Sequence, residues 1–558
     1  MPGPQDRDIA AILDALTAPG GPLETVPLAR FGTTIPALRH APPSIAHLLA
    51  HAAAEHGELP FLVDGETRLG FAEVHARARR AAAVLIVDHG IRPGDRVGIA
   101  ARNSANWAVL YFAVLLAGGC ATLLNAWWTA PELAQAVALA ECRLVLADAE
   151  RAARLAGAPC PVLAFAHEGP VLAGGGDAAL PELGPDDLAT LVFTSGSTGE
   201  PRAAWSDHRA KVHAALNFAG QALMFRELAA RAGTPMQGQP ATLASVPLFH
   251  VTGEVALLLF SLVIGRKLVM MPRWDAAEAM RLIAAERVTY FLGVPQMSRE
   301  IALHPDRDRH DLSSCVHFSA GGAARPPAHV AELRAALPHA FPLSGYGLTE
   351  TNASGCGACN ENYLARPAST GVPNRPLVDC AILDEAGQRL PPGETGEIAL
   401  RSVCNVGGYW RDPAATAALF TPDGYLRTGD LGFLDADGYL TIVDRAKDIV
   451  IRGGENIACL EVEHALHSHP DVAEAAVFGV PDARYGEVPV AAWRRRPGAT
   501  LDAAMLRTFL APRLAAFKQP TAFHECDAPL PRTGTGKIDK RSLKARFAPA
   551  QDQVKPTP

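Results

Sequence analysis

Short β-rich runs alternate with Ala- and Leu-rich helical segments over much of this chain, and this alternation limits the folds that it can adopt. The run RVGIAA at 96–101 precedes the helical segment NWAVLYFAVLLAG at 106–118, and KLVMM at 267–271 precedes AAEAMRLIAAER at 276–287. Strands that alternate with helices favour largely parallel sheets covered by helices. We therefore predict an α/β fold.

The pattern changes after about residue 372. The runs VDCAILD, GEIALRS and GYLTIVD are separated by the turn segments DEAG, PPGETG and DADG, which is typical of antiparallel strands. A later block, from 448 to 545, has the pattern of a small α+β unit. We predict a large domain of parallel-rich sheets at 1–446, which includes a surface-wrapping segment at 1–43 and a small β-barrel-like subdomain at about 372–446. A small mobile α+β domain at 447–545 and a disordered tail at 546–558 are expected to follow it.

Composition and charge argue against several classes of function. The chain has 558 residues and a net charge of −7, whereas nucleic-acid binders usually present a basic face. We find no uncharged, strongly apolar window of about 20 residues, so we expect no transmembrane segment. The start of the chain lacks the apolar run of a signal peptide, and ten scattered cysteines suit reduced thiols. We expect a cytoplasmic enzyme and leave open whether it forms a homodimer.

A loop rich in glycine and hydroxyl residues follows the apolar run LATLVF. Small residues let backbone N–H groups approach a polyphosphate closely, and hydroxyls can donate to phosphate oxygens. The Walker pattern, with Lys after its last Gly, fails here because Pro201, Arg202 and Ala203 occupy the matching places. The residues that we expect to contact phosphate are Thr194, Ser195, Gly196, Ser197, Thr198, Gly199 and Arg202.

Five short segments follow one another along the chain. They are TSGSTGEP, PLFHVTG, YGLTET, RTGD with DRAKDIVIRGGENI, and PRTGTGKIDK. Together they resemble the adenylate-forming superfamily of acyl-CoA synthetases, adenylation domains and luciferases, from about residue 45 to 545. The stretch LLNAWWTAPEL also resembles one group of bacterial acyl-CoA ligases. The resemblance implies ATP, Mg²⁺ and CoA as cofactors, and a carboxylic acid that passes through an acyl-adenylate.

The resemblance assigns catalytic roles to a few side chains. Glu350 matches a Mg²⁺ ligand, because a carboxylate beside ATP needs a cation between them, and the adjacent Thr349 matches a phosphate contact. Lys537 matches the lysine that bridges the substrate carboxylate and the α-phosphate in the first step. Lys447 occupies the hinge about which the small domain turns. His250 alone would more often be a core histidine, but the family places an aromatic gate there.

The remaining assignments concern the nucleotide, CoA and acyl sites. Tyr346 matches the aromatic that lies against adenine, and Asp430 can accept hydrogen bonds from two ribose hydroxyls. Arg445 matches a nucleotide contact, and RGGENI matches the segment beside the pantetheine arm of CoA. The other expected nucleotide or CoA contacts are Gly321, Gly322, Ala323, Gly347, Gly453 and Gly454, and the expected walls of the acyl pocket are Phe249, Val251, Gly345 and Leu348.

Several alternatives remain for the reaction. We expect a medium- or long-chain fatty acid as substrate, with an aryl or aryl-propenoic acid as the alternative. Amino-acid adenylation domains usually carry Asp in the Phe249–His250 region, so we favour free CoA over a carrier protein as the acceptor. A nucleotide-binding homologue with weak catalysis is a further alternative, because Arg202 and Ala203 replace the usual Lys and Gly.

Overall fold

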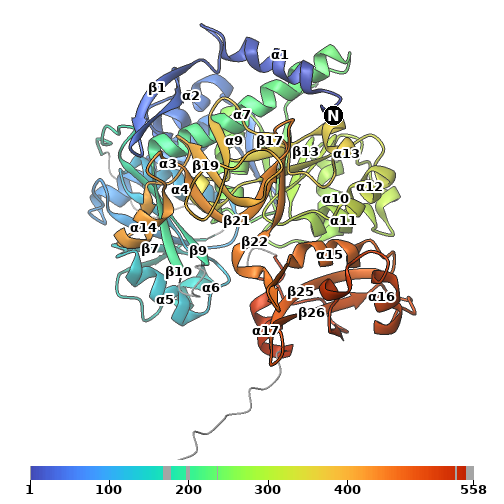
Figure 1. The fold of residues 1–558 in the computed structure, drawn as a ribbon. Coiled ribbons are helices and arrows are strands. Elements are labelled where there is room, and N and C mark those ends of the chain that lie inside the picture. The colour runs from blue at the N-terminus through green and yellow to red at the C-terminus, as the bar shows by residue number, and fades with distance from the viewer. Residues whose placement is uncertain (1, 167–177, 196–200, 236, 534–536, 548–558) are drawn as a thin grey trace, which may run out of the picture.

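The computed structural model describes residues 2–166, 178–195, 201–235, 237–533 and 537–547. Mixed sheets covered by helices form the N-terminal part, and a smaller sheet with its own helices forms the C-terminal part, red in Figure 1. The predicted α/β class, with a large and a small domain, is confirmed.

One sheet of the large domain contains the strands on either side of the predicted phosphate loop. Its order is β20-β10-β9-β6-β5-β7-β8. The strands from β9 to β8 run parallel, whereas β10 is antiparallel to both β9 and β20. The bounds are β5 Arg96–Ala100, β6 Cys120–Leu123, β7 Leu144–Ala147, β8 Val162–Ala164, β9 Leu188–Ser195, β10 Pro201–Asp207 and β20 Gly408–Tyr409.

A second sheet lies beside the first, in the order β17-β16-β15-β14-β13-β11-β12-β3-β4. Its central strands run parallel, and β4, β16 and β17 are antiparallel to their neighbours. The bounds are β3 Pro60–Asp64, β4 Thr67–Gly70, β11 Ala241–Ala244, β12 Lys267–Met270, β13 Tyr290–Gly293, β14 His317–Ala320, β15 Phe341–Tyr346, β16 Cys356–Ala358 and β17 Val372–Pro373.

Helix α4 (Ala105–Leu116) lies in the core to which both large sheets contribute. It is apolar on all sides and wholly buried, as expected of a helix enclosed by other elements. Ser104 caps its start by accepting a hydrogen bond from the backbone of Trp107. None of the helices in the described ranges combines the length and apolar character that a membrane crossing requires.

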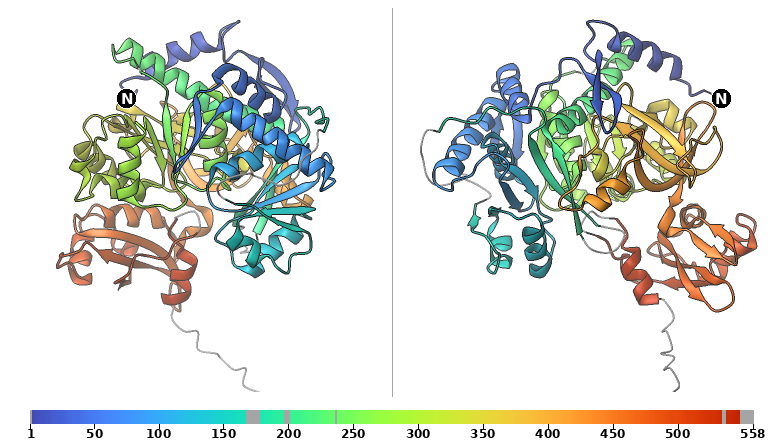
Figure 2. Two further views of the ribbon diagram at one scale, coloured as in Figure 1. Left: turned by 180° about the vertical axis from the view of Figure 1, so that it is seen from behind. Right: turned by 60° about the vertical axis from the view of Figure 1, so that its left-hand side comes forward.

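The other helices of the large domain cover the sheets, and α1 lies across α7 at the surface (Figures 1 and 2). The bounds are α1 Asp6–Thr17, α2 Ile45–His56, α3 Phe71–Val87, α5 Ala130–Leu139, α6 Ala149–Arg154, α7 His208–Arg231, α8 Val251–Gly253, the π-helix η1 Glu254–Leu259, α9 Phe260–Val263, α10 Ala276–Ala285, α11 Pro295–Ala302, η2 Arg307–Arg309, α12 Pro327–Ala336, η3 Thr349–Thr351, α13 Asn360–Ala365 and α14 Pro413–Leu419; β1 Thr25–Arg30 and β2 Thr33–Leu38 form a surface hairpin.

The antiparallel region after residue 372 forms an open sheet in the order β18-β19-β21-β22. The alternating runs are the predicted strands, but β18 and β22 stand at the two edges of this sheet among the described residues, so the barrel-like closure that we expected is wrong. Alternating apolar and polar residues indicate antiparallel pairing, but they do not determine whether a sheet closes into a barrel. Closure depends on the tilt and stagger of the strands. The bounds are β18 Val378–Leu383, β19 Gly396–Ser402, β21 Leu426–Leu434 and β22 Leu440–Arg445.

The C-terminal unit is built on the long hairpin of β25 and β26, which has separate apolar clusters on its two faces. The order of its sheet is β24-β23-β26-β25, and β27 adds to β26. The bounds are η4 Ala446–Asp448, β23 Val450–Arg452, β24 Glu455–Ile457, α15 Cys459–His467, β25 Val472–Asp482, β26 Gly486–Arg495, α16 Ala503–Leu510, η5 Ala516–Lys518, β27 Ala522–Glu525 and α17 Lys540–Phe547.

The small unit lies against α11 and α12 of the large domain (Figures 1 and 2), and charged side chains join the two parts. Arg299 donates to the carbonyl of Ala473 at 3.0 Å and to Glu332 at 2.8 Å. Glu332 also pairs with Arg496 of the small unit at 2.9 Å. The rings of His329 and His467 meet across the same boundary, with centroids 5.3 Å apart. The two parts are therefore docked through specific polar contacts.

Candidate active site

The candidate site lies where parallel strands of the second sheet end. Gly321, directly after β14, donates its backbone N–H to the carbonyl of Gly293 at the end of β13. Ligands in α/β proteins bind at such carboxyl ends. A methyl group built on Gly345, near the end of β15, would meet nothing within 4 Å. Of the predicted residues at this edge, Gly345 therefore borders open space, whereas Gly321 and Gly322 have neighbours within 4 Å.

Lys537 of the small unit reaches this edge of the large domain. A methyl group built on Gly322 would lie 3.5 Å from Cε of Lys537. Burial lowers the pKa of the Lys537 ammonium to about 8, and Arg445 acts in the same direction, while Asp430 and Glu350 oppose this shift. The structure thus brings four predicted site residues from distant segments into one electrostatic group around Lys537.

Asp430 is held on two sides. The hydroxyl of Tyr346 donates to its Oδ2 at 2.8 Å, and Nε of Arg445 lies 3.2 Å from its Oδ1. The pairing of β21 with β22 sets Asp430 opposite Arg445, which explains why these two residues meet. Burial raises the pKa of Asp430, and Arg445 is the largest opposing influence. The three predicted nucleotide contacts Tyr346, Asp430 and Arg445 therefore lie together.

Glu350 is oriented by a residue that our sequence analysis missed. The hydroxyl of Tyr409 donates to Oε1 of Glu350 at 2.7 Å. Burial, followed by Glu350, raises the pKa of Tyr409, so the phenol remains a donor at neutral pH. Tyr409 lies on β20, which pairs with β10 across more than 200 residues of sequence. Nothing in the local sequence around Tyr409 indicates this long-range pairing.

Arg202, the residue that departs from the family pattern, lies over the same tyrosine. Its guanidinium is 5.4 Å from the centroid of the Tyr409 ring, and its Nε is 3.7 Å from Oδ2 of Asp412. Arg202 is opposite Thr194 in the β9–β10 pair. Strand β10, which follows the predicted phosphate loop, thus contacts Tyr409 through Arg202, and the hydroxyl of Tyr409 in turn binds Glu350.

The predicted phosphate loop itself is partly outside the described residues. The structure places Thr194 and Ser195 at the end of β9, and Ser195 is opposite Pro201. The predicted contacts Gly196, Ser197, Thr198 and Gly199 fall among residues 196–200, which the structure does not describe. The strands that precede and follow it, β9 and β10, pair antiparallel.

His250 lies beside the lysine. Burial lowers the pKa of His250 to about 3, and the charge of Lys537 acts in the same direction, so the imidazole is neutral at physiological pH. Its Nε2 is buried without a hydrogen-bond partner among the described residues. Phe249 packs against His250 with centroids 4.7 Å apart. The neutral imidazole thus lies close to Lys537, with its Nε2 buried and without a hydrogen bond among the described residues.

The other predicted pocket residues do not share one environment. Phe249 and Val251 are buried in the main core of the large domain. Leu348 is partly buried and packs against the cluster of the open sheet that includes Tyr346. Gly347 and Thr349 follow β15, so they lie near its end with Glu350.

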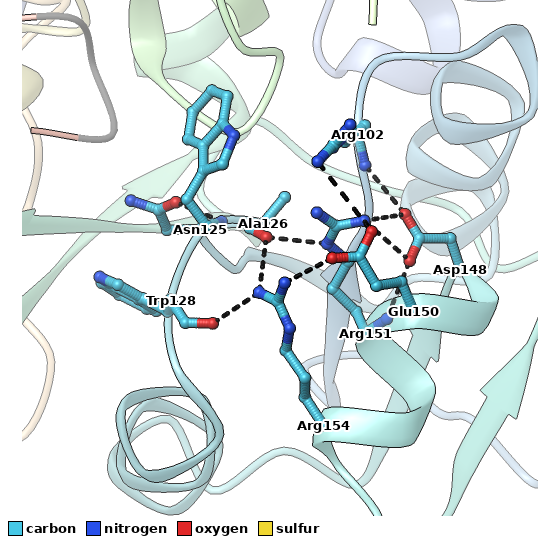
Figure 3. A network of polar contacts seen from close by, with 9 residues as sticks. Arg102, Asn125, Ala126, Trp128, Asp148, Glu150, Arg151 and Arg154 are labelled. Carbon is cyan, nitrogen blue, oxygen red and sulfur yellow. Dashed lines mark hydrogen bonds and ion pairs between the residues drawn. The ribbon is translucent and has the colours of Figure 1, made fainter. Parts of the chain in front are cut away.

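An arginine network supports the LNAWW loop (124–128), which lies next to Phe249. Figure 3 shows Arg151 and Arg154, which donate to the backbone carbonyls of Ala126 and Trp128 at 2.8 and 2.9 Å. The loop carries Trp127, which is 43% exposed and meets Phe249 edge to face, with centroids 5.0 Å apart. The loop therefore forms an outer wall behind Phe249 and His250.

The segment RGGENI lies elsewhere on the small unit. Gly453 and Gly454 form the turn between β23 and β24, with φ angles of 60° and 90°, and Gly453 donates its N–H to the carbonyl of Tyr485. Lys447 lies in η4, the short helix that follows Arg445. The docked arrangement thus presents Lys537 to the site, while this glycine turn packs against the turn between β25 and β26.

Comparison with known families agrees with this geometry. A model described as AMP-binding enzyme matches residues 49–410, and one described as AMP-binding enzyme C-terminal domain matches residues 461–537. The chain belongs to the AMP-binding enzyme family. It is therefore an enzyme of the acid–thiol ligase class.

Curated relatives include ligases for several acids. Feruloyl-CoA synthase of Amycolatopsis sp is 34% identical over 87% of this chain and 95% of the relative. A methyl-dioxo-octahydro-indenyl-propanoyl:CoA ligase of Rhodococcus jostii is 33% identical over 90% of this chain and 98% of the relative. Long-chain-fatty-acid–CoA ligase of Bacillus subtilis is 35% identical over 65% of this chain and 63% of the relative.

A solved structure has the same fold. The O-succinylbenzoate coenzyme A synthetase of Bacillus subtilis, in complex with ATP and magnesium ion, has a TM-score of 0.77 to this protein and 28% sequence identity. The match covers 90% of this chain and 99% of that chain. The family and the fold thus agree over almost the whole length of both proteins.

The environment of Arg202 predicts that lysine can replace it. A lysine ammonium can still approach Asp412 and the Tyr409 ring, because both are partly exposed acceptors of positive charge. We expect Arg202→Lys to retain ATP–pyrophosphate exchange within roughly tenfold, equivalent to about 1.4 kcal/mol of barrier. The exchange rate is measured over a range of Mg²⁺ concentrations, with Tyr409→Phe for comparison.

Tyr409→Phe removes the hydroxyl that orients Glu350, so we expect it to raise the Mg²⁺ concentration needed for half-maximal exchange more than Arg202→Lys does. A loss of more than about a hundredfold in Arg202→Lys would show that the guanidinium has a role of its own.

Proposed function

We propose that the protein is an ATP-dependent acyl-CoA ligase. It activates a carboxylic acid as an acyl-adenylate, releases pyrophosphate, and transfers the acyl group to CoA with release of AMP. The observation that carries this proposal is the position of Lys537, which comes from the small domain yet lies beside Gly322, Asp430 and Glu350 of the large domain.

The first step requires an anion to attack an anion. A carboxylate and the α-phosphate repel each other unless fixed positive charge lies between them, and such charge is a large catalytic contribution. Lys537 would supply it at the reacting oxygens, and Arg445 and Arg202 would be further cations near the nucleotide. Because two anionic ligands favour the ammonium form, binding would raise the pKa of Lys537 above about 8.

Glu350 fits the role of a protein ligand for Mg²⁺. In the part of the chain that the structure describes, no cluster of three or more His, Cys, Asp or Glu side chains could hold a metal alone. Mg²⁺ often binds one or two carboxylates together with substrate phosphates, and Tyr409 already orients the Glu350 carboxylate. When bound, the ion would shield the phosphate charges.

The second step would use a different face of the small domain. We infer that the small domain turns about Lys447, which withdraws Lys537 and brings Gly453 and Gly454 to the site. Positive φ angles and the lack of side chains let this turn pass close to a thin ligand such as the pantetheine arm. His250, neutral and beside Lys537, would separate the acyl site from the path of the thiol.

For the acid, we propose a ring-bearing substrate before a fatty acid. The relatives that align over nearly their full length include ligases for feruloyl and dioxo-indenyl-propanoyl groups. The fatty-acid ligase aligns over 63% of its own length. A medium- or long-chain fatty acid remains the second candidate because that relative has a comparable identity of 35%.

The choice of acid is tested by CoA-dependent AMP release over a panel. We expect aryl-propenoic and ring-bearing propanoic acids to give kcat/KM values at least about tenfold above those of fatty acids with 8 to 16 carbons. A clear preference for the fatty acids would overturn the proposed class, and AMP release that requires a carrier protein in place of CoA would overturn the proposed acceptor.

Lys537→Ala should separate the two half-reactions. We expect the formation of acyl-AMP to fall by about a hundredfold or more, because the fixed charge is lost, whereas thioester formation from supplied acyl-AMP stays within about fivefold. Lys518→Ala is the matched control, since Lys518 pairs with Glu461 at 2.8 Å on the small domain. An equal loss in both half-reactions would contradict this division of labour.

A further inference from the structure

Three buried polar side chains meet in the apolar core, and one of them lies one helical turn after His250. Lys211 of α7 donates to Oε2 of Glu254 at 2.6 Å, and the hydroxyl of Tyr111 on α4 donates to Oε1 of the same carboxylate at 2.8 Å. All three side chains are wholly buried, and Tyr111 belongs to the main apolar cluster. Burial raises the pKa of Tyr111, and the charge of Glu254 acts in the same direction, so the phenol keeps its proton. We call Tyr111, Lys211 and Glu254 the buried triad.

Stability alone gives little reason for the buried triad. Desolvation of two charges offsets much of their attraction, and apolar residues of similar volume often stabilise a core as well or better. Charged hydrogen bonds do supply direction, because they fix the angle and distance at which the partners lie. The buried triad therefore fixes the carboxylate of Glu254 from two helices at once, α4 and α7.

Glu254 is the first residue of the π-helix η1, which joins α8 to α9. A π-turn contains one residue more than an α-turn, and such turns are rare and frequently lie at functional sites. If η1 relaxed to an α-helix, the residues before it would turn by about one residue relative to those after it, roughly 100° around the axis. Because the buried triad holds Glu254 in place, it opposes this relaxation at the start of η1.

A buried arginine supports the middle of the same π-helix. Nη2 of Arg266 donates to the carbonyls of Ala256 and Leu257 at 3.2 and 3.3 Å, and its Nε donates to Oγ of Ser261 at 2.8 Å. Buried carbonyls need such partners when they leave the regular α-helical pattern. The π form of η1 is therefore held at two points, by the buried triad at its start and by Arg266 along its length.

A short, tightly folded segment connects the start of η1 to His250. The backbone N–H of Glu254 donates to the carbonyl of His250 at 2.8 Å, and the N–H of His250 donates to the carbonyl of Pro247 at 3.2 Å. A methyl group on Gly253 would collide with the same Pro247 carbonyl, so the segment has little room to absorb a shift. A movement of Glu254 is therefore passed to His250, whose imidazole lies close to Lys537.

We propose that Tyr111, Lys211 and Glu254 are positioning residues, which keep η1 in its π form and thereby orient His250 between the acyl site and the path of the thiol. They act through His250 and not through contact with a substrate. This inference rests on the proposed function, because it assigns the orientation of His250 to the thioester step. It leaves the charges around Lys537 in place, so it concerns the second half-reaction more than the first.

An apolar replacement of the whole triad separates a positioning role from a merely structural one. The variant Tyr111→Phe/Lys211→Met/Glu254→Leu keeps side chains of similar volume and removes the charges, so we expect its Tm to lie within about 5 °C of the parent or above it. Thioester formation from the supplied acyl-AMP of the best acid in the panel should fall at least about tenfold, whereas ATP–pyrophosphate exchange stays within about threefold.

The matched control removes a largely buried ion pair at the amino end of β12, away from the carboxyl ends that border the site. Lys267, the first residue of β12, pairs with Glu286 at 2.8 Å, and the two side chains are 17% and 10% exposed. Lys267→Met/Glu286→Gln should leave both half-reactions within about twofold of the parent.

His250→Ala provides the decisive comparison. Because the buried triad acts through His250, the triple replacement should change thioester formation by less than about twofold in the His250→Ala protein, although it has its full effect in the parent. Tyr111→Phe alone, which keeps the ion pair, decides the question if the triple variant does not fold. It should lower thioester formation about threefold in the parent and leave it unchanged in the His250→Ala protein.

Three results would overturn the inference: unchanged thioester formation in a folded triple variant or in Tyr111→Phe, an equal fall in both half-reactions, or the same loss with and without His250. Failure of the proposed function is distinguishable, because the parent protein would then show no CoA-dependent AMP release with any acid.

Discussion

The proposed first step needs a positive charge between the substrate carboxylate and the α-phosphate, and the rest of the site depends on this constraint. Lys537 is carried by the small domain, but Asp430, Glu350 and Arg445 of the large domain determine its electrostatic surroundings. Gly321 and Gly322 directly follow β14 at this edge, so no large side chain occupies the place that the lysine reaches. The catalytic proposal therefore depends as much on domain docking as on any one residue.

The docking surface is polar and partly buried, which suits a contact that must be released. Arg299, Glu332 and Arg496 connect the domains through hydrogen-bonded ion pairs. Such pairs fix orientation at little net gain in stability, because desolvation offsets much of the attraction. We infer that this balance lets the same small domain leave after the first step and present its glycine turn for the second.

The sequence predicted the α/β class and the ordered segments because local patterns specify strands, helices and short binding loops. It also named Tyr346, Asp430, Arg445 and Lys537, which the structure brings together. Contacts between distant segments could not be read in this way. Tyr409 reaches Glu350 only through the pairing of β20 with β10, and the alternating runs after residue 372 gave no information about whether their sheet closes.

Locking the docked arrangement tests the central claim most directly. Cysteines introduced at Glu332 and Arg496, whose side chains meet at 2.9 Å, can be joined by a flexible bis-maleimide, with the identically treated parent as control. The account predicts that the cross-linked protein keeps ATP–pyrophosphate exchange within about threefold and loses acyl-CoA formation by about a hundredfold, with recovery when a cleavable linker is cut. Full acyl-CoA formation in the cross-linked protein would contradict it.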